Sequence, residues 1–141
     1  CDLAIASYES KFATPGVNLG LFCSTPMVAL SRNVNKKNAM EMLLTGDFIS
    51  AEKAKEIGLI NNAVSKEELA YKVTELAEKI ASKSTMTVST GKKAFYAQSE
   101  MDLSKAYEYT SKIMTDNLLK HDAKEGINAF IEKRSPDWKD E

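Results

Sequence analysis

The sequence predicts an α/β protein in which a small part with short strands is followed by a mostly helical region. Three observations carry this prediction. Two short apolar runs, Cys1–Ser7 and Lys11–Thr14, have the character of buried strands. An apolar stretch from Phe12 to Pro26 contains two Pro and two Gly residues, which is typical of a shaped pocket wall or turn. The rest of the chain is mostly amphipathic helix.

So few strands do not make a self-sufficient sheet, so the chain is interpreted as the second half of a larger α/β domain with a helical appendage. It opens on an apolar run, Cys1–Ala6, that has neither an initiator Met nor a preceding cap. We therefore expect a piece of a longer chain. A processed but complete domain is the alternative.

Composition excludes several classes of function. The 141 residues carry a net charge of −1, and the charges of both signs are interspersed, so no basic surface for nucleic acid or an anionic membrane is expected. No apolar run has the length of a membrane span. The two cysteines, Cys1 and Cys23, form no CxxC pair and have no nearby His, so we expect neither a disulfide nor a metal site.

The first helices have local start and stop signals. Pro15-Gly16 is a turn signal, and Thr25 is expected to cap a helix with Pro26 at its first position, ending at residues 33–35. Good helix formers predict a second helix over residues 36–44, with Thr45-Gly46 as its stop. Ser50 is expected to cap a third helix over residues 51–57, and residues 59–64 return as an extended segment.

Longer amphipathic helices follow. Ser65 and Glu68 form a capping box for a helix whose apolar residues make one stripe. Further helices are predicted over residues 86–98 and 102–120, and a last one from Asp122 to about residue 134. Several apolar helix faces on one short chain indicate a core or a subunit interface, and we expect an oligomer.

Three blocks of residues carry a more specific signal: Cys1-Asp2-Leu3-Ala4 with Phe12-x-x-Pro15, the run from Ala39 through Thr45-Gly46-Asp47-x-Ile49-Ser50-Ala51 to Gly58-Leu59, and Glu125-Gly126-x-x-Ala129-Phe130-x-Glu132-Lys133-Arg134. Together they resemble the enoyl-CoA hydratase/isomerase (crotonase) family, over essentially the whole chain. The run from Ala13 to Pro26 is most similar to the divergent subgroup of mitochondrial enoyl-CoA hydratase domain-containing proteins.

The resemblance implies a crotonase (ClpP-like) spiral of ββα turns, of which this chain matches the C-terminal half, with two or three short strands. It implies that residues 1–64 belong to the crotonase core and that residues 65–141 form a helical oligomerisation region. Family members assemble as homotrimers or dimers of trimers. The implied ligand is an acyl-CoA thioester, with no cofactor other than the coenzyme A of the substrate, and the implied compartment is the mitochondrial matrix or the cytoplasm.

The family chemistry rests on groups that this chain only partly contains. Backbone N–H groups expected before Cys1 would form an oxyanion hole for a thioester enolate. Family hydratases use two glutamates, one expected before Cys1 and the other directly after the Pro of the Phe-x-x-Pro segment. That second position is Gly16, and loss of one positioned acid or base typically costs about 10²- to 10⁴-fold in rate. No catalytic residue is therefore assigned, and standard hydration is doubtful.

The resemblance also implies which residues bind the ligand. The acyl end of the pocket is expected to be lined by Pro15, Gly16, Leu21, Phe22 and Cys23, for which ordinary core packing is the alternative. The coenzyme A nucleotide is expected near Lys133, Phe130 and Met114. The alternative for Lys133 is a cation that favours a helix C-terminus.

Two further residues, His121 and Cys23, have side chains that can react. His121, the single histidine, is expected to have an exposed, structural role at a helix junction, with a catalytic role as the alternative. Cys23 is expected to be a packed thiol, with a reactive thiol in the pocket-like stretch as the alternative.

Two functions remain open at this point. The first is an enzyme of acyl-CoA thioesters whose chemistry needs no Glu at position 16, such as thioester cleavage, decarboxylation, or a reaction whose acid/base group lies elsewhere. The second is a non-catalytic coenzyme A-binding or oligomeric scaffold protein.

Overall fold

A computed structural model describes all residues from 1 to 141. The chain forms two compact units, Cys1–Leu76 and Ala77–Glu141, and the division falls inside helix α4 (Lys66–Ala81). Each unit is described by itself. The functional boundary expected between residues 64 and 65 stays a prediction.

The first unit contains four short strands in two two-stranded sheets: β1 (Ile5–Ser7), β2 (Lys11–Phe12), β3 (Ile49–Ser50) and β4 (Asn62–Val64). The strands β1 and β4 are parallel, with Ile5 opposite Asn62. The strands β2 and β3 are antiparallel, with Lys11 opposite Ser50. The sequence did not indicate β3, because a two-residue strand is too short to show an alternating pattern.

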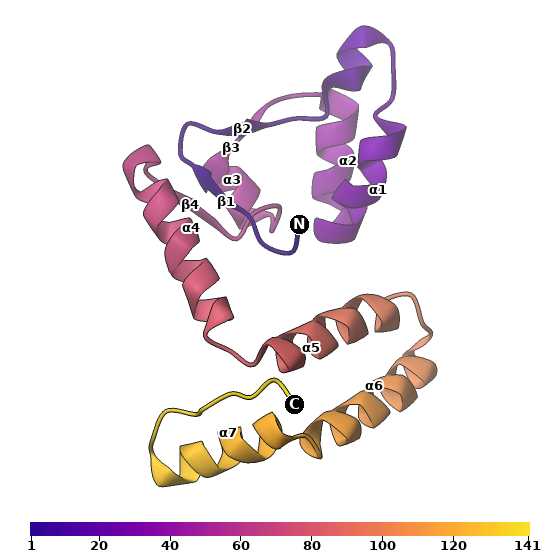
Figure 1. Ribbon diagram of the computed structural model, residues 1–141. Helices are drawn as coiled ribbons and strands as arrows, with labels where there is room; N and C mark the ends of the chain where they lie inside the picture. Colours follow the sequence, from indigo (N-terminus) through magenta and orange to yellow (C-terminus); the bar gives the residue numbers. More distant parts are fainter. The chain divides into compact units, whose positions relative to one another are not determined.

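Helices of the first unit are η1 (Pro15–Leu19, a 3-10 turn), α1 (Ser24–Asn33), α2 (Lys36–Thr45), α3 (Ala51–Glu56) and the start of α4 (Figure 1). Local signals set most of their ends. The side chain of Ser50 accepts a hydrogen bond from the Lys53 amide at 3.2 Å, as a helix N-cap does. Gly46 ends α2 in the left-handed conformation, at φ 67°. Both predictions are confirmed.

The start of α1 differs from its prediction. The helix begins at Ser24, so Thr25 is already inside it and does not cap it. The N-cap position belongs to Cys23, whose carbonyl accepts the Met27 amide at 2.9 Å although its side chain makes no capping bond.

Two buried clusters hold the first unit. One comprises Leu30, Val34, Ala39, Met42 and Leu43 from α1, α2 and their junction. The other comprises Ala51, Ala54, Ile60 and Ala63 around α3 and β4. Phe12 and Ile49, which lie opposite each other across β2 and β3, pack against both clusters. The segment that leads into residue 16 is therefore anchored in the core.

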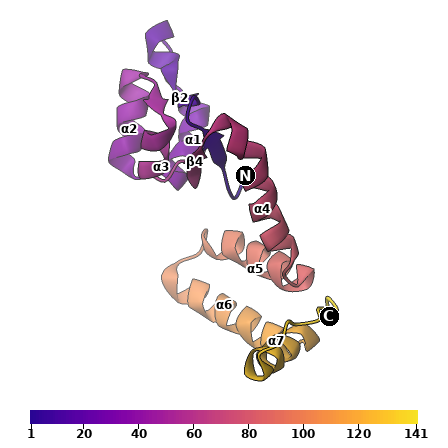
Figure 2. The same cartoon turned by 90° about the vertical axis from the view of Figure 1, so that its left-hand side faces the viewer.

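The second unit is helical, with α5 (Thr85–Gln98), α6 (Leu103–Leu118) and α7 (His121–Glu132) after the end of α4. Figure 2 shows α5 and α6 side by side. Asp102 caps α6 by accepting the Lys105 amide at 3.1 Å. At the start of α4, Ser65 accepts the Glu68 amide at 3.2 Å and donates to the Glu68 carboxylate at 3.0 Å, which confirms that pair as a cap.

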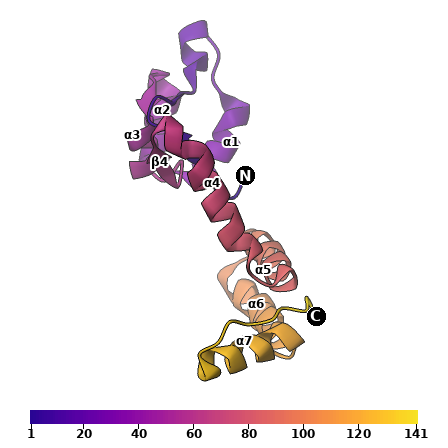
Figure 3. The ribbon, with the colours of Figure 1, turned by 60° about the vertical axis from the view of Figure 1, so that its left-hand side comes forward.

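The end of the chain, Ser135–Glu141, turns back along α7 and is called the C-terminal strap (Figure 3). The indole N–H of Trp138 donates to the Ser82 carbonyl at 2.9 Å. The Asp140 carboxylate accepts the Thr85 amide at 2.6 Å and the Met86 amide at 3.2 Å. The strap therefore joins the N-terminus of α5 to α7.

Candidate functional site

The residues from Pro15 to Cys23 form a closed loop, called here the pocket loop. The amide of Leu21 donates to the Gly16 carbonyl at 2.9 Å, and the amide of Gly16 donates to Cys23 Sγ at 3.2 Å. Gly20 makes the turn between them with φ 73°, a conformation that favours glycine. The structure thus brings together Gly16, Leu21 and Cys23, three of the five residues predicted for the acyl end of the pocket.

The space around position 16 is too small for a side chain. A Cβ atom at this position would lie 2.7 Å from Cys23 Sγ and 2.7 Å from the Leu21 carbonyl oxygen. Its φ is not positive, so backbone conformation alone does not demand glycine there. The loop is packed closely around position 16, and any side chain there would require Cys23 or the backbone at Leu21 to shift.

Three of the predicted loop residues are exposed. The side chains of Leu21 and Phe22 are 67% and 43% exposed, and Pro15 is exposed at the start of η1. Leu19 is exposed as well, at 79%. The loop therefore presents an uncharged, largely apolar surface, because none of its residues is acidic or basic.

A hollow of about 560 Å³ lies beside this loop in the first unit, and it contains none of the five predicted residues. Its apolar wall includes Phe12, Ala13, Pro26 and Leu30, and its polar positions are Asp2, Lys11, Thr14, Asn33 and Asn61. Thr14 is buried, and its hydroxyl donates to the Met42 carbonyl at 2.9 Å. The sequence signals for this hollow were the Phe12–Pro26 stretch and the motif residues Cys1–Ala4 and Gly58-Leu59, whereas Asn33 and Asn61 had no functional signal.

The three predicted coenzyme A residues, all in the second unit, do not share one hollow. Phe130 is 85% exposed and lines a hollow of about 550 Å³ together with Val88, Ile127 and Trp138. Met114 lines a different hollow, of about 530 Å³, between α5 and α6. Lys133 follows α7 in the left-handed conformation, with φ 54° and an exposed side chain.

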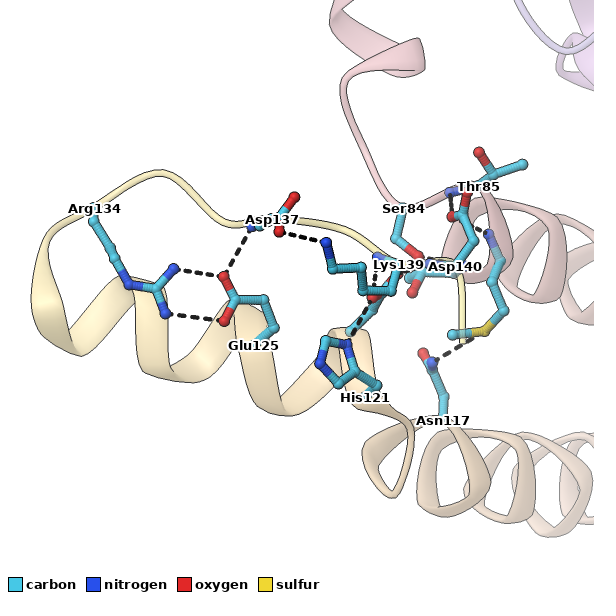
Figure 4. Close-up of polar contacts among 12 residues, drawn as sticks. Ser84, Thr85, Asn117, His121, Glu125, Arg134, Asp137, Lys139 and Asp140 are labelled. Atoms are coloured by element: carbon cyan, nitrogen blue, oxygen red, sulfur yellow. Dashed lines mark hydrogen bonds and ion pairs between the residues drawn. The ribbon is translucent and has the colours of Figure 1, made fainter.

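Asp122 is the most buried charged residue, with a side chain that is fully enclosed. Its carboxylate accepts the Lys139 and Asp140 amides at 2.8 and 3.0 Å, and it lies 3.3 Å from His121 Nδ1 (Figure 4). The hydrogen bond from the Ser84 side chain is the largest of the effects that lower the pKa of Asp122, to about 2. His121 thus lies beside an anchor of the strap, and its structural role stays a prediction.

A second carboxylate, Glu125, anchors the strap from the next turn of α7. It forms a bidentate ion pair with the Arg134 guanidinium and accepts the Asp137 amide at 2.8 Å (Figure 4). The Arg134 hydrogen bond is the main reason that the pKa of Glu125 is lowered to about 2. The conspicuous charged groups of the second unit thus hold structure together.

No three His, Cys, Asp or Glu side chains are grouped so that they could bind one metal ion. None of the helices combines the length and apolar character needed to cross a bilayer.

Comparison with known proteins gives a consistent result. The family model for enoyl-CoA hydratase/isomerase matches residues 1–141. The human mitochondrial enoyl-CoA hydratase domain-containing protein 3 is 53% identical over 141 residues, which are 100% of this chain and 46% of that protein. A probable mitochondrial enoyl-CoA hydratase of Dictyostelium discoideum is 39% identical, over 98% of this chain and 50% of the relative.

Solved structures agree with the sequence comparisons. The crystal structure of an enoyl-CoA hydratase of Mycobacterium smegmatis has a TM-score of 0.94 and 47% identity, covering 98% of this chain and 54% of that chain. The structure of the human domain-containing protein 3 has a TM-score of 0.92 and 54% identity, with 98% and 55% covered. The chain spans about half the length of the relatives that it matches and has their crotonase fold over that span. It belongs to the enoyl-CoA hydratase/isomerase family.

Proposed function

We propose that this chain is part of an acyl-CoA thioester-binding protein that stabilises a thioester enolate by chemistry that needs no acid at position 16. The observation that carries the proposal is Gly16 itself. It occupies the position of the second family glutamate, directly after Pro15, in a chain that matches the family model throughout. The fold supports the family ligand, whereas this residue argues against the family's standard hydration.

An uncharged loop favours reactions in which the enolate forms without a base at this wall. Decarboxylation is one example, because the electron pair of the breaking C–C bond passes into the thioester as CO₂ leaves, and water then protonates the α-carbon. Such a reaction needs the oxyanion hole, which is worth a few kcal/mol per donor, but not a second carboxylate. Hydrolysis of the thioester is the alternative. It passes through a tetrahedral oxyanion in place of an enolate, because water adds to the carbonyl carbon and gives its proton to a base outside the pocket loop, and the thiolate of coenzyme A then leaves.

Exposed side chains of each unit are proposed to contact acyl-CoA, and those of the second unit would approach it from a neighbouring subunit. Leu21 and Phe22, with Pro15 and Cys23, would contact the acyl group through apolar surface. Lys133 would contact a phosphate of coenzyme A, and Phe130 offers an exposed ring for its nucleotide. Met114 is the weakest assignment, since it lies in a separate hollow from Phe130.

Assembly and location follow from the same family argument. A homotrimer or a dimer of trimers would cover apolar side chains that α6 and α7 leave exposed, such as Leu103, Tyr107 and Ile131. The names of several relatives include the word mitochondrial, and we propose the mitochondrial matrix as the compartment in preference to the cytoplasm.

The test uses the natural full-length protein. Crotonyl-CoA would report hydration, butyryl-CoA thioester cleavage, and a malonyl-type acyl-CoA decarboxylation, while calorimetry measures binding of each. We expect binding of acyl-CoA together with turnover of a substrate other than crotonyl-CoA. Absence of both binding and turnover across the panel would refute the proposal.

The second candidate function is a non-catalytic coenzyme A-binding or oligomeric scaffold. The same Gly16 favours it, interpreted as the loss of a catalytic site. It predicts that coenzyme A protects the protein against thermal unfolding while no acyl-CoA is turned over. Measurable hydration of crotonyl-CoA by the unmodified protein would eliminate it.

A further inference from the structure

We infer that Gly16 and Cys23 form a coupled pair, in which Cys23 is a positioning residue that keeps the pocket loop closed over the place of a side chain at position 16. The packing of the loop therefore excludes a glutamate at position 16, and one substitution at this position cannot restore a working carboxylate. The inference rests on the proposed function only where it takes this loop as the wall of the acyl pocket.

The contacts of position 16 come from both sides of the loop. Cys23 Sγ accepts the Gly16 amide at 3.2 Å and would lie 2.7 Å from an added Cβ. The Cys23 amide nitrogen would lie 3.3 Å from the same atom. Real Cβ atoms do not approach other atoms as closely as 2.7 Å, so either the thiol moves or the loop opens.

The backbone of the loop is held at the same point. The Leu21 carbonyl oxygen would also lie 2.7 Å from a Cβ at position 16. The bond from the Leu21 amide to the Gly16 carbonyl, at 2.9 Å, keeps the backbone of residue 21 close to position 16. Removing the sulfur atom should therefore relieve part of the clash and not all of it.

The arrangement has a consequence for the substrate. With position 16 closed, the wall from Pro15 to Cys23 contains no carboxylate, and the group at its inner side is a thiol that accepts a backbone N–H. A water molecule at this wall would find no base on the loop. The pair therefore selects for acyl-CoA reactions that proceed without proton transfer at this position.

The experiment compares variants in the natural full-length protein. Gly16→Ala, Cys23→Ala and the double variant form a thermodynamic cycle, read out as the melting temperature. Gly91→Ala is the matched control, because a Cβ at Gly91, in the middle of α5, would meet nothing within 4 Å. Cys23→Ser tests rescue of the amide bond, and the NMR shift and exchange rate of the Gly16 amide report that bond directly.

We expect Gly16→Ala to lower the melting temperature by roughly 2–8 °C and Gly91→Ala to leave it unchanged or raise it. The double variant should lose less than the sum of the two single variants. The Gly16 amide should exchange faster in Cys23→Ala and recover in Cys23→Ser. Gly16→Glu should show no hydration of crotonyl-CoA and a lowered melting temperature.

Three results would overturn the inference: a neutral Gly16→Ala, additive losses in the cycle, or hydration by Gly16→Glu in a loop that remains stable. None of them depends on acyl-CoA turnover by the unmodified protein, which tests the proposed function. Failure of the one is therefore distinguishable from failure of the other.

Discussion

Arg134 and Glu125 are joined by two parallel hydrogen bonds although they lie nine residues apart in the chain. The pair closes the turn after α7, where Lys133 takes the left-handed conformation. Because Glu125 also accepts the Asp137 amide, one carboxylate fixes both the turn and the first part of the C-terminal strap. The geometry, more than the charge, makes this contact specific.

Replacement of Arg134 by Lys is expected to weaken the strap. The ammonium keeps the charge but cannot donate two parallel bonds to Glu125. In the natural full-length protein we expect faster proteolysis after residue 134 and a melting temperature lower by a few degrees. Lys72→Arg is the control, since Lys72 forms an exposed pair with Glu75 on α4. If Arg134→Lys were as stable as the unmodified protein, the two parallel hydrogen bonds between Arg134 and Glu125 would not be needed for stability.

Acid should destabilise the second unit. The folded-state pKa values of Asp122 and Glu125 are lowered to about 2 from ordinary values of 3.8 and 4.5, so both groups favour the folded state when they are ionised. Their contribution is fully present above about pH 5 and is lost as the pH falls towards 2. Circular dichroism during acid titration should show helix loss in that window.

Replacement of Asp122 by Asn separates this effect from general acid unfolding. In the asparagine side chain, an NH₂ group replaces one of the two acceptor oxygens of the carboxylate. One of the backbone N–H groups of Lys139 and Asp140 therefore loses its acceptor, and stability near pH 7 should fall. Its dependence on pH between 5 and 2 should become shallower. Asp116→Asn, on the exposed face of α6, should keep the original slope. A slope unchanged in Asp122→Asn would contradict the assignment.

Local and long-range features differed in how far the sequence could predict them. Ser50 and Gly46 mark helix ends through bonds within four residues, so their types were sufficient. Trp138 and Ser82 are 56 residues apart, and no pattern connects them. The strap was missed for this reason, although Glu125 and Arg134 were both seen in the family motif.

The candidate site divides in the same way. The sequence alone identified position 16, because the Pro15-Gly16 pair follows the Phe12-x-x-Pro15 motif. The packing of Gly16 against Cys23 could not be predicted, because the loop closes through contacts of the backbone and the sulfur atom that no residue pattern encodes. The sequence therefore predicted which residue type stands at position 16, and the structure adds the contacts that a side chain there would meet.

Replacement of Asp140 by Ala should loosen the start of α5. Its carboxylate accepts the Thr85 and Met86 amides, two of the N–H groups that a helix leaves without partners at its start. Loss of such a cap costs about 1 kcal/mol. Hydrogen exchange at these two amides should accelerate about fivefold. The control, Asp137→Ala, removes only an exposed pair with Lys139 and should leave them protected.

Isolated, the 141-residue chain is expected to self-associate or to melt without a sharp transition. Helix α4 buries none of its residues, and Val73 and Ile80 on its apolar side are 47% and 39% exposed. On α7, Phe130 and Ile131 are 85% and 70% exposed, and apolar surface of this extent is normally covered by a partner. Sedimentation velocity and a urea titration of the isolated chain would test this. A monomer with one cooperative transition at high concentration would show that these faces need no partner.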